Sequence, residues 1–285
     1  MLPPDDVIQA NVRAALAEDL GEPDFSDISG DLTAQLIPAE KTARARIVTR
    51  DEAILSGQAW AEACFRAADP AMGMHWHARD GEAIMSGQLL CELEGKARAL
   101  LTAERSALNF LQTLSGVATA THRYVEAIAG TKARIYDTRK TLPGLRQALK
   151  YAVRCGGGEN HRVGLYDGIL IKENHIAAAG GIRPALEQAF RLAPAGVFVQ
   201  IEVETLKQLQ EALDCGAKLI LLDNFDLAMM REAVYLAAGR AQLEASGGVG
   251  LATVRAIAET GVDRISIGSL TKHLHAVDLS MRIID

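Results

Sequence analysis

Short apolar runs alternate with amphipathic stretches through the second half of the chain, and this rhythm predicts its architecture. The apolar runs that we predict as strands are 133–137, 168–171, 197–203, 218–222, 242–245 and 264–268. Apolar positions recur at helical spacing near 143–154, 182–192, 205–214, 226–237 and 250–260. Strands that alternate with helices in this way imply a parallel sheet. We predict a (β/α) barrel of about six to seven parallel strands, with a doubly wound sheet as the alternative.

The first part of the chain has a different pattern. Residues 5–19 place apolar side chains on one helical face, and 43–49, 75–79 and 88–94 resemble strands separated by glycines. A long helix follows at 102–129, where Gly116 is a candidate point of close packing. We therefore predict an N-terminal α+β sandwich domain over 1–115, with 274–285 as a candidate addition, and a barrel domain over 116–273.

Polar or glycine-rich residues follow nearly every predicted barrel strand. These strand ends are Asp137–Lys140, Lys172–His175, Glu202–Glu204, Asp223–Asn224, Glu244–Gly248 and Gly268–Ser269. A barrel gathers the ends of its strands around one mouth, so six such motifs at the same point of the repeat indicate a shared site. A single one would be ordinary solvated surface.

The stretch Asp137–His175 is basic within an acidic chain. It holds seven Lys or Arg against four Asp or Glu, whereas the chain carries a net charge of −6. Arg146, Lys150 and Arg154 follow i,i+4 spacing, and we interpret them as an exposed helix stripe.

The other basic residues of this stretch lie at strand ends or beside the glycines 156–158. They are Arg139, Lys140, His161, Arg162 and Lys172. Arg can grip a carboxylate or phosphate with two hydrogen bonds, and Lys supplies a compact positive charge. Gathering these cations without a counter-charge would be costly, so we predict a pocket for a small, multiply anionic substrate.

Two acids and two small-residue motifs complete the predicted site. Glu202 and Asp223 would serve as ion-pair partners, or would bind sugar hydroxyls or Mg²⁺. The last two strand ends suit a phosphate held by backbone N–H groups, although plain turns have the same composition. The residues concerned are Ser246, Gly247, Gly248, Gly268 and Ser269.

The longest motif, DTRKTLPGLRQALKYAVRCGGGENHRVGLYDGILIKENHI, resembles the central signature of the quinolinate phosphoribosyltransferase family, also called nicotinate-nucleotide pyrophosphorylase (carboxylating). GDLT and ALLTAERSALNFLQTLSGVAT before it fit the same family, as do IEVET, LLDNF, EASGG and ISIGSLTKH after it. The resemblance covers most of the chain, and the first hundred or so residues match more loosely. It implies phosphoribosyl transfer from phosphoribosyl pyrophosphate to quinolinate with decarboxylation, a step of NAD biosynthesis that gives nicotinate mononucleotide.

The resemblance also implies roles for individual residues. Lys140, Glu202 and Asp223 would be catalytic, with Mg²⁺ bound through the substrate and these two acids. The binding set for quinolinate and pyrophosphate would be Arg105, Thr138, Arg139, Lys140, His161, Arg162 and Lys172. In this family the residue at the position of Arg105 reaches into a neighbouring subunit, so a homodimer is expected, with a higher oligomer left open.

Charge and composition narrow the cellular setting. A sequence pI near 5.7 argues against a nucleic-acid partner, and no apolar run approaches the roughly 18 residues of a membrane span. The acidic start does not resemble a secretory signal. Four well-separated cysteines indicate reduced thiols, and we expect a cytoplasmic protein.

Three alternatives stay open from the residues. A phosphoribosyltransferase-like protein of molybdate-transport operons shares part of the motif. An aldolase would use Lys172 as a Schiff-base lysine, which requires a desolvated amine. A sensor on a barrel scaffold would bind a phosphate ligand without turnover.

Overall fold

The computed structural model describes residues 2–284 and divides into two compact units. Unit 1 comprises the residues up to His122, Thr141–Gly157 and the residues from Thr271 onward. Unit 2 comprises Arg123–Lys140 and Gly158–Leu270. The chain therefore leaves unit 2 after Lys140, re-enters it at Gly158 and returns to unit 1 at Thr271.

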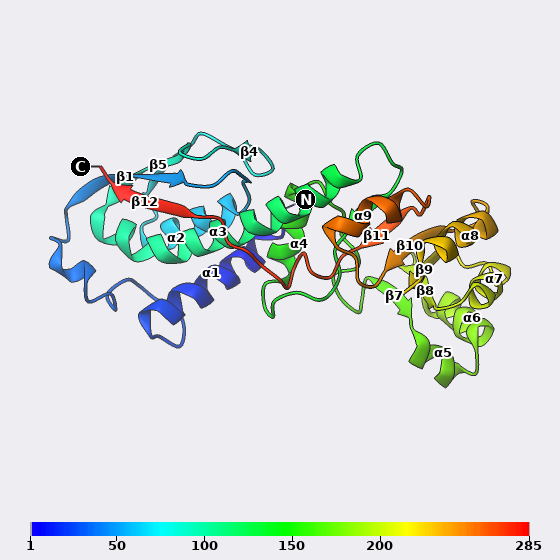
Figure 1. Cartoon of the computed structure of the whole chain (residues 1–285). Helices are drawn as coiled ribbons and strands as arrows, with labels where there is room; N and C mark the ends of the chain where they lie inside the picture. Colours follow the sequence, from blue (N-terminus) through cyan, green and yellow to red (C-terminus); the bar gives the residue numbers. More distant parts are fainter. Residues whose placement is uncertain (1, 285) are drawn as a thin grey trace. The chain divides into compact units, whose positions relative to one another are not determined.

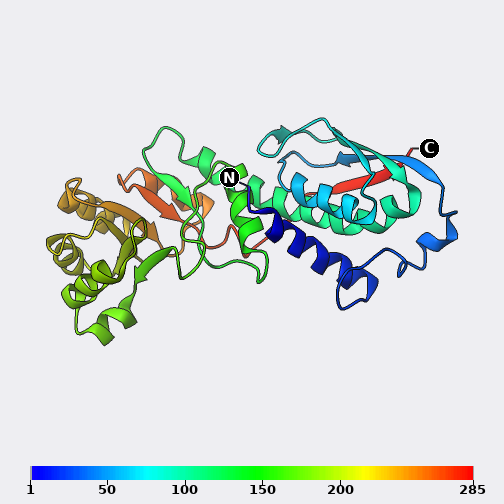
Figure 2. The same cartoon turned by 180° about the vertical axis from the view of Figure 1, so that it is seen from behind.

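An antiparallel sheet with the order β12-β1-β5-β3 organises unit 1 (Figure 1). Its strands are β1 (Thr42–Thr49), β3 (Gly73–Trp76), β5 (Leu89–Lys96) and β12 (Leu279–Ile283), and β2 (Ala53–Ile54) pairs separately with β4 (Ala83–Ile84). Burial alternates along β1, as expected of a sheet with one covered face. The last strand returns to the N-terminal sheet, where Ile47 of β1 pairs with Met281 of β12 (Figure 2).

Helices supply the rest of the unit 1 core. They are α1 (Asp5–Leu20), the 3-10 helix η1 (Ala34–Leu36), α2 (Gln58–Ala68), α3 (Ala97–Ala127) and α4 (Arg146–Cys155). Trp60 and Phe65 of α2 are fully buried in one cluster with Ile47 and with Leu149 of α4. Gly116 of α3 is a point of close approach, as its sequence position suggested. A Cβ there would collide with the carbonyl oxygen of His275, so the C-terminal segment can lie directly against the helix.

The structure corrects the interpretation of α4 as an exposed basic stripe. Lys150 is only 2% exposed, Arg146 is half-buried with its Nε donating to Thr141 Oγ1 at 3.2 Å, and only Arg154 is exposed. The reason is that Thr141–Gly157 belongs to unit 1, where α4 buries its apolar side in the core. The division drawn at residues 115 and 116 falls inside the continuous helix α3, so the compact units follow a different boundary.

Six parallel strands form the sheet of unit 2. They are β6 (Arg134–Tyr136), β7 (Gly168–Ile171), β8 (Phe198–Val203), β9 (Leu219–Asp223), β10 (Gln242–Ser246) and β11 (Arg264–Ser266). The helices are α5 (Glu173–Ala179), α6 (Ile182–Leu192), α7 (Leu206–Asp214), α8 (Leu227–Ala237) and α9 (Leu251–Ala258). The sequence pattern located all of these elements except α5.

The strand order β6-β11-β10-β9-β8-β7 identifies the barrel. From β7 to β11, consecutive strands are neighbours, and the first strand, β6, pairs with the last, β11, whereas a doubly wound sheet reverses direction at a switch point. β6 and β7 lie at the two edges of the sheet. Glu159 lines the β6 edge, where its N–H donates to Ile135 O at 2.7 Å and its carbonyl accepts from Asp137 N at 3.1 Å.

Side-chain caps fix where two of the helices begin. Thr205 Oγ1 accepts a hydrogen bond from the N–H of Gln208, and Asp226 Oδ1 accepts one from Met229. The loop after each strand is therefore short, which keeps the polar residues close to the strand ends. Across residues 2–284, no helix combines the length and apolar character needed to cross a membrane.

Candidate active site

The carboxyl ends of the barrel strands surround one cavity of about 460 Å³. Every second residue of a strand faces the same side, and Glu202 of β8, Leu221 of β9 and Glu244 of β10 are partners in register. Ten predicted site residues line this cavity, namely Thr138, Arg139, Lys140, His161, Arg162, Lys172, Glu202, Asp223, Ser246 and Gly247. The barrel thus brings together residues from the whole length of unit 2.

Two guanidinium groups meet at the cavity with unused hydrogen-bonding capacity. The Nε atoms of Arg139 and Arg162 are buried and make no hydrogen bond to any described residue. Burial lowers the pKa of Arg162, and the like charge of Arg139 lowers it further, while Asp167 acts in the opposite direction. Arg162 Nη1 donates to the carbonyl of Gly168 at 2.8 Å, which holds the side chain in place. Two close cations with free donors are suited to binding an anion.

Lys172 and Glu202 form an ion pair at the ends of β7 and β8. The Nζ of Lys172 lies 3.0 Å from Glu202 Oε2, with the lysine side chain 48% exposed and the glutamate 12% exposed. Lys172 also begins α5, because its backbone N–H donates to Nδ1 of His175 at 3.0 Å. A half-exposed amine paired with a carboxylate is not the desolvated lysine that a Schiff-base aldolase needs.

Asp223 and the segment 246–248 form a second wall. Asp223 pairs in register with Ser246 and accepts a hydrogen bond from Asn224 Nδ2 at 3.0 Å. Gly247 has a φ of +97°, and a Cβ there would collide with the side-chain amide of Asn224. Only glycine fits this position without strain.

The remaining predicted residues lie in different places. Gly268 lies against Lys140 and Thr138, since a Cβ there would come within 2.9 Å of Lys140 Cδ. Gly248 and Ser269 are not among the residues that line the cavity, although Gly248 directly follows Gly247. Arg105 is exposed on α3 in unit 1 and is not among the residues that line the cavity.

Four residues at or beside the cavity were not predicted. Three of them line it, namely Leu170, Leu221 and Ser266. Asn224 and Glu244 also line it; they lie in the predicted strand-end motifs, but no role was predicted for them. The fourth residue, Gln200, is fully buried and contacts His161. A polar residue two positions before Glu202 in a buried strand was the available signal, because both side chains then face the same side.

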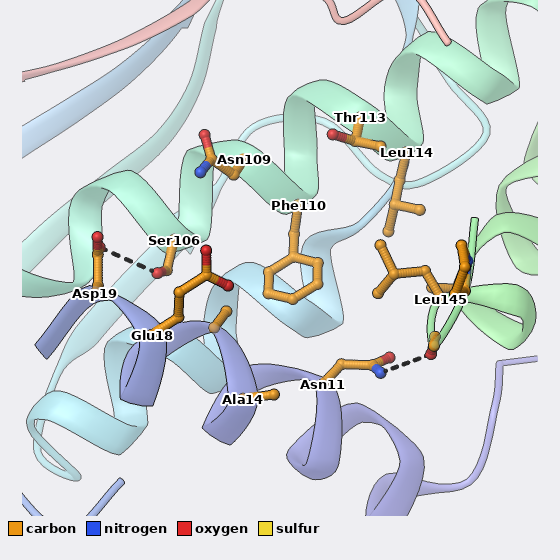
Figure 3. A pocket seen from close by; sticks show the side chains of 14 residues that line it. Asn11, Ala14, Glu18, Asp19, Ser106, Asn109, Phe110, Thr113, Leu114 and Leu145 are labelled. Atoms are coloured by element: carbon orange, nitrogen blue, oxygen red, sulfur yellow. Dashed lines mark hydrogen bonds between the residues drawn. The ribbon is translucent and has the colours of Figure 1, made fainter. Parts of the chain in front are cut away.

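A second cavity, of about 430 Å³, lies within unit 1 between α1, α3 and the segment before α4 (Figure 3). Phe110, Leu114 and Leu145 supply apolar surface, and Glu18 and Asp19 supply carboxylates. No Lys, Arg or His is among the described residues that line it. Its charge is therefore the opposite of what a polyanion requires, so we assign the anion site to the barrel cavity.

Fold and site together define a barrel protein with a cationic pocket for a multiply charged anion. The models of the quinolinate phosphoribosyl transferase N-terminal and C-terminal domains match residues 31–115 and 117–282. The chain therefore belongs to the quinolinate phosphoribosyltransferase family.

Individual relatives agree with this assignment. A probable nicotinate-nucleotide pyrophosphorylase (carboxylating) of Bacillus subtilis is 44% identical over 90% of this chain and 88% of its own. The solved structure of the nicotinate-nucleotide pyrophosphorylase from Francisella tularensis aligns with a TM-score of 0.93 at 43% identity, covering 99% of this chain and 97% of that one. The nicotinate-nucleotide pyrophosphorylase from Pyrococcus furiosus aligns with a TM-score of 0.70 at 17% identity, covering 99% of this chain and 77% of that one. At this identity the similarity shows the shared fold alone.

Proposed function

We propose that the protein transfers a phosphoribosyl group from phosphoribosyl pyrophosphate to quinolinate and releases pyrophosphate and CO₂, giving nicotinate mononucleotide for NAD synthesis. The observation that carries this proposal is the cavity lined by Arg139, Arg162 and Lys172 together with Glu202 and Asp223. A pocket that combines several cations with two carboxylates suits a dianionic acid beside a phosphorylated sugar. The names of the similar proteins support the same reaction.

The two carboxylates of quinolinate would bind the guanidinium groups of Arg139 and Arg162 and the amine of Lys172, which all line the cavity. Thr138 and His161 would complete this side of the pocket. Because a guanidinium can bind a carboxylate through two parallel hydrogen bonds, the two arginines would fix the plane of the pyridine ring.

Phosphoribosyl pyrophosphate would occupy the opposite side. Lys140 would neutralise charge on the departing pyrophosphate, and backbone N–H groups would hold the 5′-phosphate. The residues that we assign to the phosphate are Ser246, Gly247, Gly248, Gly268 and Ser269.

Glu202 and Asp223 also fit a role in holding Mg²⁺. No group of three or more His, Cys, Asp or Glu residues among residues 2–284 is arranged to hold a metal by itself. Mg²⁺ commonly binds through one or two carboxylates together with substrate phosphates, which matches two acids at neighbouring strand ends. When bound there, Mg²⁺ would neutralise charge on the pyrophosphate.

The proposed chemistry has two stages. The pyridine nitrogen attacks C1′ of the ribose with its lone pair as the bond from C1′ to the pyrophosphate oxygen breaks, so no general base is needed. Glu202 and Asp223 stabilise the positive charge that develops on the ribose. The pyridinium nitrogen then draws in the electrons of the adjacent ring–carboxylate bond, CO₂ departs, and the ring carbon takes up a proton.

We also propose that the active form is a homodimer in which Arg105 completes the neighbouring site. Its exposure on α3 supports this role, since an arginine must be accessible to reach a partner. A cytoplasmic location is supported by the four cysteines, which form no disulfide in the described residues. Burial raises the pKa of Cys64 and of Cys91 to about 12, as expected of unreactive thiols.

Incubation of the protein with carboxyl-labelled quinolinate, phosphoribosyl pyrophosphate and Mg²⁺ tests the proposal. The expected result is equimolar release of CO₂, pyrophosphate and nicotinate mononucleotide, with no product when nicotinate replaces quinolinate. Binding without turnover would instead indicate a sensor, and turnover of a different acceptor would favour the molybdate-operon class.

A further inference from the structure

Three buried side chains form a hydrogen-bonded line at the cavity, which His161 and Glu244 both line. His161 Nε2 lies 2.7 Å from Gln200 Oε1, and Gln200 Nε2 donates to Glu244 Oε2 at 2.9 Å. Gln200 lies on β8 and Glu244 on β10, so the line connects two strands that are separated by β9. His161 is 8% exposed, and the other two residues are fully buried.

The direction of each hydrogen bond in this line is determined from both ends. A carboxylate can only accept, so Gln200 must point its NH₂ group toward Glu244 and its oxygen toward His161. The Nε2 atom of His161 must then carry a hydrogen. At the other side of the ring, the backbone N–H of Arg162 donates to Nδ1 at 2.8 Å, so Nδ1 must carry no hydrogen. The two independent constraints select the same tautomer.

Further contacts fix the position of the ring. The backbone N–H of His161 donates to the buried carboxylate of Asp137 at 2.9 Å, and Phe198 packs edge-on with its centroid 5.5 Å away. Both ring nitrogens bind protein atoms, so the ring offers the cavity mainly its C–H edges. Such a surface suits contact with a flat aromatic ring better than contact with a carboxylate.

We propose that Gln200 and Glu244 are positioning residues that hold the His161 ring fixed, with its C–H edge against the face of the aromatic acid. This inference rests on the proposed function for the identity of the acid, quinolinate. Gln200 and Glu244 act through His161 and thereby set the affinity for the pyridine ring, while the arginines bind its carboxylates. A buried carboxylate is costly to maintain, and Glu244 Oε1 makes no hydrogen bond to the described residues, so packing alone does not explain its presence.

The test combines nitrogen-15 NMR of histidine-labelled full-length protein with steady-state kinetics. The signals of His161 are assigned by their loss in His161→Asn. In the unsubstituted protein we expect Nδ1 bare and Nε2 protonated. In Gln200→Leu, which keeps a similar volume, we expect Nδ1 to stay bare because the Arg162 N–H still donates to it, while the Nε2 signal shifts because its N–H has lost its acceptor. The KM for quinolinate should rise roughly tenfold, as for one lost hydrogen bond, with kcat and the KM for phosphoribosyl pyrophosphate nearly unchanged.

Two further variants make the result decisive. Gln242→Leu is the matched control, because Gln242 lies on β10 and binds Arg264 at the opposite end of the strand, and it should leave both measurements unchanged. Glu244→Gln replaces the carboxylate with an amide that can also donate, so the direction of the line is no longer forced. We expect the same tautomer, a smaller shift of the Nε2 signal and a smaller rise in the KM for quinolinate, which decides the question if Gln200→Leu does not fold.

A proton on Nδ1 in the unsubstituted protein would overturn the proposal. So would a Gln200→Leu variant that keeps both the Nε2 shift and the KM. The NMR measurement needs no turnover, so its result is separate from that of the proposed function. If the protein is inactive but the Nε2 signal of His161 shifts in Gln200→Leu, the result counts against quinolinate as substrate and supports the role of Gln200 in holding the ring.

Discussion

Lys172 and Glu202 form an ion pair of 3.0 Å between the ends of two neighbouring barrel strands. The two residues lie 30 positions apart in the chain, and the parallel arrangement of β7 and β8 brings them together. The pair joins the cationic and acidic sides of the cavity.

Lys172→Ala should lower kcat/KM for quinolinate by on the order of 10²–10³-fold, because a cation facing the substrate would be lost. The free energy of unfolding should change by less than about 1 kcal/mol, since the lysine is half exposed. Lys132→Ala is the matched control, because Lys132 forms a 2.8 Å pair with Asp263 and does not line the cavity. Equal activity in the two variants would contradict our assignment of Lys172.

Arg162→Ala should nearly abolish turnover while the fold stays intact. The lost hydrogen bond to the Gly168 carbonyl costs about 1 kcal/mol, and relief of repulsion from Arg139 offsets part of that loss. Quinolinate at about one hundred times its Kd should stabilise the unsubstituted protein by about 2.7 kcal/mol but should not stabilise the variant. Thermal unfolding with and without ligand measures this difference. Arg50→Ala, which removes an exposed pair with Asp278, should keep the full ligand effect.

Gly247→Ala should raise the KM for phosphoribosyl pyrophosphate more than the KM for quinolinate. The new methyl group would displace Asn224 and the phosphate-binding segment, at a strain cost of about 1 kcal/mol or more. Gly239→Ala is the control, because Gly239 has a φ of +76° and open space around its Cα. That variant should lose similar stability from backbone strain but keep both KM values. If both variants show the same kinetics, Gly247 does not shape the phosphate site.

Asp80 should make stability depend on pH with a negative slope. Burial raises its pKa above the ordinary value of 3.8, while hydrogen bonds from Tyr151 and from the amides of Gly57 and Gln58 oppose the shift. Between the unfolded and folded pKa values, the folded state binds more protons. The contribution of Asp80 to the free energy of unfolding is therefore fully present below pH 3.8. It is lost as the pH rises through the raised pKa of Asp80 in the folded state.

Urea unfolding across acidic pH measures this slope, which should weaken in Asp80→Asn. Asp27 provides a control of opposite sign, because hydrogen bonds with Ser29 lower its pKa. The contribution of Asp27 to stability should be present above its pKa in the unfolded state. It should be lost as the pH falls through its lowered pKa in the folded state. An unchanged slope in Asp80→Asn would show that other groups set the pH dependence.

Mixing Arg105→Ala with Lys172→Ala tests the homodimer. If Arg105 acts in the neighbouring site, each mixed dimer contains one site with both residues intact. Random exchange of subunits between two inactive variants should then restore roughly a quarter of the sites. Activity of the mixture measures the recovery. No recovery, or full activity of Arg105→Ala alone, would place Arg105 outside the site.

Some residues of the site could be predicted from the sequence alone, and others could not. The strand-end positions of Arg139, Lys172, Glu202 and Asp223 were readable, because parallel strands of similar length bring their carboxyl ends to one edge. Ten residues of the predicted site do line one cavity. Gln200 was not predicted, because its role depends on contact with His161, which lies 39 positions away in the chain.

The sequence itself determined two features, because they follow from local periodicity and composition. These are the alternation of strands and helices and the basic character of Asp137–His175. Only the tertiary structure decided that Lys150 is buried, that Thr141–Gly157 belongs to the N-terminal unit and that β12 pairs with β1. It also decided the direction of the line from Glu244 to His161. The physical reason is the same in each case, because burial and hydrogen-bond direction depend on neighbours that are distant in the chain.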